Sequence, residues 1–222
     1  MVCGYSRKYI PCEIPGIFTC SISQMKDHSI SVDHAIYATS IVVKHLDNAT
    51  VKKSTDFYNT TLPYDMIFTK DDTSTSDEQV EKLNRELKIH YRDCIGSLIY
   101  LLSTRVDLSF AVHKLVNFSS NTGKVHFEGL VNLLRYIMDN KTLVLNYYAD
   151  MKDASLYDQF KQANISTDNQ LMVLSDFSWQ YCIDTGRITG AYMIFYQGGL
   201  IDHGTHVLGP VAQSSAESEH NA

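Results

Sequence analysis

The sequence lacks the surplus of basic residues that free-standing nucleic-acid-binding domains carry. Its 222 residues include 19 Lys and Arg against 25 Asp and Glu, which gives a net charge of −6. Because phosphate backbones are bound mainly through Lys and Arg, this balance argues against a domain that binds nucleic acid on its own. Contact with nucleic acid would need a local basic patch.

Cysteine is scarce, and long apolar runs are missing. The chain has five cysteines, at Cys3, Cys12, Cys20, Cys94 and Cys182. They show neither the paired spacing of zinc ligands nor the density of a secreted disulfide scaffold. No apolar run reaches the roughly 18 residues that span a bilayer, and the N-terminus lacks the apolar core of a signal peptide. We therefore expect reduced thiols, no membrane partner and a cytoplasmic location, with the nucleus as the alternative.

The first third of the chain predicts a small β and α segment. Alternating polar and apolar residues over 17–22, after Pro15 and Gly16, favour strands, and a hairpin is expected within residues 10–32. A helix is expected from Ser31 or Asp33 to about Leu46. Residues 70–79 contain no apolar side chain, so they predict a solvated linker and a boundary.

The rest of the chain changes from helical to strand patterning. Apolar residues recur at steps of three and four over 95–102, 108–116 and 127–138, which predicts three amphipathic helices. Residues 143–148 favour a strand and residues 150–170 a polar connector. From residue 171 onward, apolar strands separated by glycine-bearing turns predict two or three antiparallel strands. Together these patterns predict an α+β fold.

Two carboxylates are the candidate metal ligands. Asp176 follows the apolar stretch 171–174, where a carboxylate can hold a divalent cation or simply begin a turn. Near the C-terminus, Ser214 and Glu217 fit a capping box, which leaves Glu219 available for a metal. Hydrolysis with two magnesium ions needs several converging carboxylates, so this pair alone is too small a set. Asp184 and Asp202 lie in turn-like contexts and are expected to be solvated.

Several motifs in order resemble copia-type retrotransposon polyproteins. Residues 91–112 read YRDCIGSLIYLLSTRVDLSFAV, which is similar to the family pattern Y-R-x-x-I-G-S-L-x-Y-L-x-x-x-R-P-D-I-x-F-A-V. His126-Phe127 stands where the family has His-Trp, and residues 134–137 resemble its L-R-Y-L. Residues 173–179, VLSDFSW, are similar to Y-S-D-A-D-W, and residues 214–219, SSAESE, to S-S-T-E-A-E.

This resemblance implies the end of a reverse transcriptase running into the start of ribonuclease H. The expected parts are a short β/α remnant of the polymerase with its linker (1–79), a helical thumb-like middle (80–150) and a partial ribonuclease H-like mixed sheet (171–222). Asp176 and Glu219 would then be the catalytic, metal-binding acids, and Mg²⁺ the cofactor. The implied partners are an RNA–DNA hybrid and the rest of the polyprotein.

Departures from the family pattern predict a chain that is inactive by itself. Val106 replaces the proline of R-P-D, Ser178 replaces the second acid of D-A-D-W, and a lysine-rich segment becomes residues 200–206, LIDHGTH. Residues 1–90 supply no Y-x-D-D hairpin for polymerisation, and the sequence ends at Ala222, inside the expected metal-binding helix. Magnesium binding by this fragment is therefore expected to be weak or absent.

Two other functions compete with the retrotransposon interpretation. Asp184-Thr185-Gly186 spells the triplet of aspartic proteases, but the strongly apolar strand and the flap that accompany it are not evident. A non-enzymatic interaction module, or a decayed relic of the element, is the stronger alternative. His203 and His206 have a spacing that a metal would tolerate, but they are expected to be loop residues.

Overall fold

The computed structural model describes residues 9–14, 17–46, 60–63, 66–74, 76–148, 150, 152, 157–162, 171–178, 184–185 and 187–207. The chain forms two compact units. One unit combines residues 1–34 with residues 144–222, and the other is the continuous stretch 35–143. The first unit holds the strands and the second holds most of the helices, so the predicted α+β class is confirmed.

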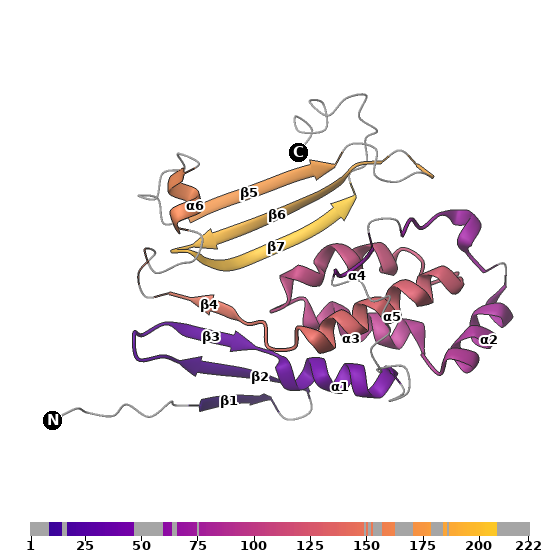
Figure 1. Ribbon diagram of the computed structural model, residues 1–222, viewed down its shortest axis with the longest axis horizontal. Coiled ribbons are helices and arrows are strands. Elements are labelled where there is room, and N and C mark those ends of the chain that lie inside the picture. Colours follow the sequence, from indigo (N-terminus) through magenta and orange to yellow (C-terminus); the bar gives the residue numbers. More distant parts are fainter. Residues whose placement is uncertain are drawn as a thin grey trace. The chain divides into compact units, whose positions relative to one another are not determined.

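The first unit contains a four-stranded antiparallel sheet in the order β1-β2-β3-β4 (Figure 1). Its strands are β1 (Tyr9–Ile14), β2 (Ile17–Gln24), β3 (Ile30–Asp33) and β4 (Leu145–Tyr147). The predicted hairpin is present as β1 and β2, and the predicted strand near residue 145 as β4. The turn before β3 is closed by Asp27, whose Oδ1 accepts from both the backbone N–H and the hydroxyl of Ser29. Ser31 of β3 donates to Asn146 of β4 at 2.6 Å.

A second, three-stranded antiparallel sheet lies in the same unit, in the order β5-β6-β7. Its strands are β5 (Leu171–Ser178), β6 (Thr189–Tyr196) and β7 (Gly199–Val207), and the short helix α6 (Tyr157–Gln162) precedes them. Gln197 and Gly198 both have positive φ, 48° and 75°, which suits the tight turn of a twisted hairpin. All pairings described here are antiparallel, so the parallel strand of the expected mixed sheet is not among the described strands.

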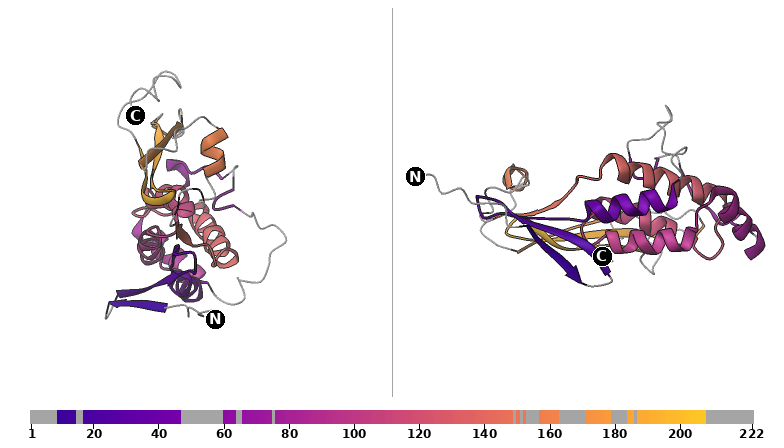
Figure 2. Two further views of the ribbon diagram at one scale, coloured as in Figure 1. Left: turned by 90° about the vertical axis from the view of Figure 1, so that its left-hand side faces the viewer. Right: turned by 90° about the horizontal axis from the view of Figure 1, so that it is seen from below.

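The second unit is a helical bundle (Figures 1 and 2). It consists of α1 (Ala35–His45), α2 (Asp77–Leu87), α3 (Tyr91–Leu101), α4 (Ser109–Val116) and α5 (Lys124–Asp139), with the 3₁₀ turns η1 (Lys70–Asp72) and η2 (Val106–Leu108). Helix α1 packs against both α3 and α5. The core is a single apolar cluster in which fully buried leucines each contribute roughly 1.5–3 kcal/mol; its leucines with no exposure are Leu98, Leu101, Leu108, Leu115, Leu130, Leu133 and Leu134.

The stretch that begins at Tyr91 connects helices of this bundle. The buried Tyr91 hydroxyl donates to the carbonyl of Leu115 at 2.9 Å, which ties the start of α3 to the end of α4. The next residue, Arg92, donates from Nε to the carbonyl of Ser119 at 2.7 Å. Gly96 has nothing within 4 Å of where a Cβ would stand, so among the described residues it does not serve a close helix contact.

The three predicted helices of the middle region are confirmed as α3, α4 and α5. Two local expectations are wrong. Residues 30–33 form β3, so α1 begins at Ala35 rather than after a cap at Ser31 or Asp33. The expected linker 70–79 carries η1 and the first turn of α2. None of the described helices is long and apolar enough to cross a membrane.

Candidate metal centre

Of the two candidate ligands, Asp176 lies within the described residues, and Glu219 lies outside them. Asp176 is on β5, opposite Ala191 of β6. The apolar stretch 171–174 does not end the strand, because β5 continues to Ser178. The side chain is exposed, and its Oδ1 accepts the N–H of Phe177 at 2.9 Å. The carboxylate is therefore accessible in the middle of a strand rather than at its end.

The face of the sheet that carries Asp176 brings it no second carboxylate. Asp176, Ala191 and Thr205 form one row across the three strands. Side chains alternate along a strand, so the neighbouring rows of this face lie two residues away. Those rows are Leu174–Met193–His203 and Ser178–Thr189–Val207. Among the described residues, no group of three or more His, Cys, Asp or Glu side chains could hold a metal ion.

Asp202 belongs to the opposite face. It pairs with Ile194 and lies three residues from Thr205 along β7. Because side chains alternate along a strand, an odd separation places the Asp202 side chain on the other face of the sheet from Thr205. Its Oδ2 accepts from the hydroxyl of Tyr192 at 3.4 Å, and its Oδ1 accepts the N–H of His203 at 2.8 Å. The described strands thus separate these two aspartates, and the described residues of this sheet do not by themselves form a set of converging magnesium ligands.

Aromatic rings cover glycines on the face that carries Asp202. A Cβ on Gly190 would collide with the ring of Phe177 on the neighbouring strand. A Cβ on Gly204 would lie 2.6 Å from Cε1 of Tyr192. Glycine at these two positions therefore permits close packing of a ring against the backbone. On this face the rings of Phe177 and Tyr192 therefore lie directly over the backbone of the neighbouring strands.

The histidines of β7 do not form a ligand pair. His203 and His206 are three residues apart in a continuous strand, so their side chains leave opposite faces. The ring of His206 lies edge-on to Phe177, with centroids 6.2 Å apart. The expectation that both histidines lie in a loop is wrong, because both belong to β7.

The protease-like triplet is described only in part. Asp184 and Thr185 are exposed in a turn, and Gly186 lies outside the described residues.

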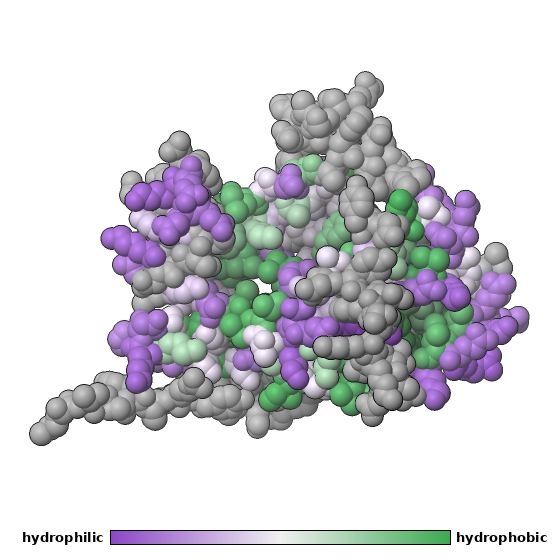
Figure 3. Space-filling view, in the orientation of Figure 1, coloured by the Kyte–Doolittle hydropathy of each residue, from purple (hydrophilic) through white to green (hydrophobic). Residues whose placement is uncertain are grey.

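Apolar side chains are exposed on the sheet β5–β7, where Leu171 is 56%, Val173 60% and Ile201 54% exposed. Figure 3 shows hydrophobic residues in the region of β5–β7 on the face in view.

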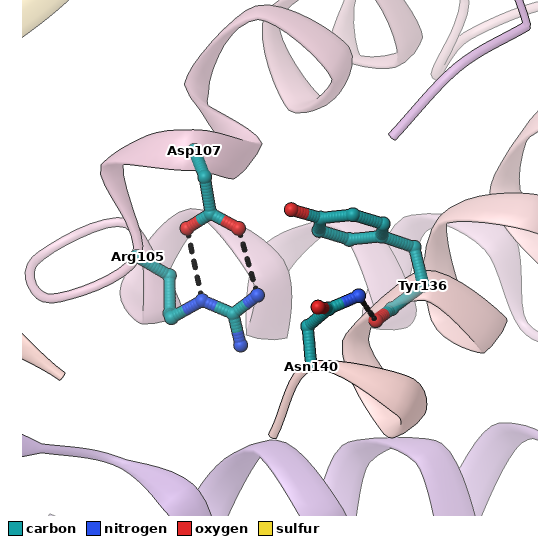
Figure 4. A network of polar contacts seen from close by, with 4 residues as sticks. All are labelled: Arg105, Asp107, Tyr136 and Asn140. Carbon is teal, nitrogen blue, oxygen red and sulfur yellow. Dashed lines mark hydrogen bonds and ion pairs between the residues drawn. The ribbon is translucent and has the colours of Figure 1, made fainter. Parts of the chain in front are cut away.

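The helical unit also contains a polar network that the sequence did not predict, shown in Figure 4. The guanidinium of Arg105 is 3% exposed and donates to both carboxylate oxygens of Asp107. Tyr136 of α5 lies beside this pair; burial, and secondarily the charge of Asp107, raises the pKa of its phenol. Asn140 donates from Nδ2 to the carbonyl of Tyr136 at 3.0 Å. The Arg-x-Asp spacing was visible in the sequence, but its burial was not.

Comparison with known proteins places the chain among transposon-derived sequences. It is 26% identical over 144 residues to the Retrovirus-related Pol polyprotein from transposon TNT 1-94 of Nicotiana tabacum, covering 64% of this chain and 10% of that protein. It is 31% identical over 93 residues to an uncharacterized mitochondrial protein of Arabidopsis thaliana, covering 41% of this chain and 69% of that protein. No family model matches, and no solved structure matches.

A further relative has a different description. The chain is 28% identical over 135 residues to "Secreted RxLR effector protein 161" of Plasmopara viticola, covering 60% of this chain and 84% of that protein. The matches therefore include a very long polyprotein, of which this chain spans about a tenth, and two short proteins, of which it spans most.

Proposed function

Because the chain belongs to the family of copia-type retrotransposon Pol polyproteins, we propose that it joins the end of a reverse transcriptase to the start of ribonuclease H. The order of the parts supports this assignment. The motif at residues 91–112 forms α3, η2 and α4, and an antiparallel sheet carrying Asp176 follows it along the chain. In the family, the corresponding protein copies RNA into DNA and cuts the RNA strand of the hybrid.

We further propose that this chain completes neither reaction alone. The observation that carries this proposal is the isolation of Asp176, whose face of the described sheet holds no other carboxylate. Phosphodiester cleavage with two metal ions requires several acids that converge on one point. Residues 1–90 contain no Y-x-D-D sequence either, so the acids of the polymerase reaction are missing from that stretch. The chain would then act as a structural part of a larger assembly.

A cleavage assay on a labelled RNA–DNA hybrid tests the incapacity. Purified wild-type protein, Asp176→Asn and Asp202→Asn would be compared with and without Mg²⁺. Asp202→Asn is the matched control, because Asp202 lies on the same sheet but on the other face. We expect all three proteins to give the same background.

A specific pattern of cleavage would contradict this proposal. If the wild type cut the RNA strand with Mg²⁺, and Asp176→Asn removed the activity while Asp202→Asn retained it, the chain would be a nuclease. The assignment to the ribonuclease H region would then gain support, and only the claim of inactivity would fail.

A non-enzymatic interaction module is the second candidate function. The short relative described as a secreted effector favours it, because this chain spans 84% of a protein far smaller than a polyprotein. The helical unit is one continuous stretch, residues 35–143, with its own apolar core. Such a unit can be retained for contacts with another protein after enzymatic functions are lost.

Binding of the hybrid distinguishes the two candidates. A connecting piece of the polymerase and nuclease should bind an RNA–DNA hybrid more weakly as salt rises, because its contacts to phosphates release counterions. An interaction module that contacts only protein needs no phosphate-binding surface, so it should show no measurable binding at any salt concentration. Fluorescence anisotropy with a labelled hybrid, measured from low to physiological salt, gives the answer.

A further inference from the structure

His126 caps the start of α5 with its imidazole ring. The side chain has no exposure, and its Nδ1 accepts the backbone N–H of Gly123 at 3.0 Å. His126 is the third residue of α5, the position at which Glu or Gln accepts the same N–H in a capping box. Because Nδ1 is the acceptor, the neutral ring must carry its proton on Nε2.

The ring is enclosed by aromatic side chains. Phe118 stacks on it with centroids 4.1 Å apart, and Phe68 lies tilted against it at 5.1 Å. Nε2 has no hydrogen-bond partner among the described residues. A second proton would bind to Nδ1, the nitrogen that accepts the N–H of Gly123. That proton would have no acceptor among the described residues.

The same ring holds the segment 66–74 against α5. Phe68 belongs to that segment and contacts both Phe118 and His126. At its far end, Ser74 donates from its backbone to Asn121 at 3.0 Å and from its hydroxyl to Thr122 at 2.6 Å. These contacts all converge on residues 118–126. Loss of the Gly123 contact would loosen the platform on which the segment lies.

The charged groups around the ring give opposing influences. Burial lowers the pKa of His126, and the nearby carboxylate of Asp72 raises it to a smaller extent. Asp72 itself accepts from the backbone and the hydroxyl of Thr69, at 2.9 and 2.8 Å. Of the other charged neighbours on η1 and α5, Lys70 and Asp71 are exposed, and Lys124 pairs with Glu128 at 3.8 Å.

We propose that protonation of His126 releases the segment 66–74 from the start of α5, which makes this contact an acid-operated latch. Protonation places a hydrogen on Nδ1 opposite the N–H of Gly123, so that donor faces donor. The unfolded or released state, whose histidine titrates near pH 6.5, binds the proton more readily than the closed state. The contact between the segment 66–74 and the start of α5 is therefore most stable above about pH 6.5, and its stability decreases as the pH falls below that value.

Hydrogen exchange of the full chain tests this proposal. Protection factors, corrected for intrinsic exchange, would be measured at pH 7.5 and 5.5 for the amides of Asp72, Thr73 and Ser74. We expect protection in the wild type to fall severalfold and by no more than about tenfold, which is the limit set by a released-state histidine that titrates near pH 6.5. His126→Gln keeps an acceptor at the capping position without a titrating ring, so its protection should not fall.

His45→Gln is the matched control, because His45 is also buried and its Nε2 also has no described partner. This variant should keep the wild-type fall. A fall that persists in His126→Gln, or that disappears in His45→Gln, would overturn the assignment.

A measurement on the wild-type protein covers the case in which a variant does not fold. Nitrogen-resolved NMR of the His126 ring should show the proton on Nε2 at pH 7.5. The ring should titrate over the same pH range in which protection is lost. A proton on Nδ1 at pH 7.5, or loss of protection without titration of His126, would contradict the proposal.

Discussion

Arg105 and Asp107, which are separated by one residue, form a bidentate ion pair. Nε of Arg105 donates to Oδ1 of Asp107 at 2.9 Å, and Nη2 donates to Oδ2 at 2.7 Å (Figure 4). The arginine side chain is 3% exposed and the aspartate 27%. Parallel hydrogen bonds of this kind fix the geometry of both groups. The pair therefore stiffens the turn η2, which lies between α3 and α4 in the sequence.

Removal of the aspartate charge should destabilise the helical unit strongly. Asp107→Asn leaves the guanidinium of Arg105 buried without a counter-charge, which costs about 3 kcal/mol. Urea denaturation followed by circular dichroism measures the change. Glu86→Gln, which removes an exposed ion pair with Lys82, is the control and should cost less than about 0.5 kcal/mol. Equal losses in the two variants would show that the Arg105 pair is not special.

Proline should be accepted at position 106, where the family motif has it. Val106 is the first residue of η2, a position that needs no backbone N–H, and Arg105 before it has φ −113° and ψ 70°, outside the helical region. Val106→Pro should leave stability unchanged or raise it by up to about 1 kcal/mol. Lys114→Pro, in the second turn of α4, removes an intrahelical N–H donor and should lose about 3 kcal/mol. Thermal melts of the two variants compare them directly.

Two glycines should respond to alanine in opposite directions. Gly123→Ala places a methyl group against the carbonyl oxygen of Asp72, so α5 and η1 must separate, at a cost of about 1–3 kcal/mol. Gly96→Ala fills open space within α3 and should stabilise the protein by about 0.5–1 kcal/mol. Denaturation midpoints measured under identical conditions decide this. Stabilisation by Gly123→Ala would mean that the close approach to Asp72 is incorrect.

Asn84, a residue of α2, should cap the N-terminus of the next helix, α3. Its Oδ1 accepts the N–H of Tyr91 at 3.2 Å, and its carbonyl accepts the N–H of Ile89 at 3.1 Å. Asn84→Ala leaves the first N–H of α3 without this acceptor and should cost about 1 kcal/mol. Asn84→Asp keeps an acceptor and adds negative charge near a helix N-terminus, so most of the stability should return. Chemical denaturation gives both values, and an equal loss in the two variants would rule out capping.

The helices around residues 91–139 could be predicted because their apolar residues recur with the helical period and are buried on one side. The segment 70–79 could not be predicted from polarity alone. Helix α2 begins there with Ser76 accepting the N–H of Gln79, and none of its residues is buried. The cap at Ser76 and the spacing of Val80, Leu83 and Leu87 were signals for this helix, but the absence of apolar residues before Val80 obscured them.

The strand that carries Asp176 was predictable, but its neighbours on the sheet were not. Which face Asp202 occupies depends on the register of β6 and β7, and a bulge shifts that register between Ile194 and Phe195. A bulge alters which residues share a face without leaving a clear mark in the sequence. Likewise, the contact of Gly123 with Asp72 joins segments that no local pattern connects.

The four-stranded sheet joins segments that lie before and after the helical unit in the sequence, and this has a kinetic consequence. Ser31 and Asn146, which bond across β3 and β4, are 115 residues apart in sequence. Closing so long a loop in an unfolded chain is slow and entropically unfavourable, whereas the helices between them form through more local contacts. Collapse of the helical unit shortens that loop before its ends meet. In refolding, helical signal should therefore recover in an earlier phase, and completion of the sheet should follow as the rate-limiting step.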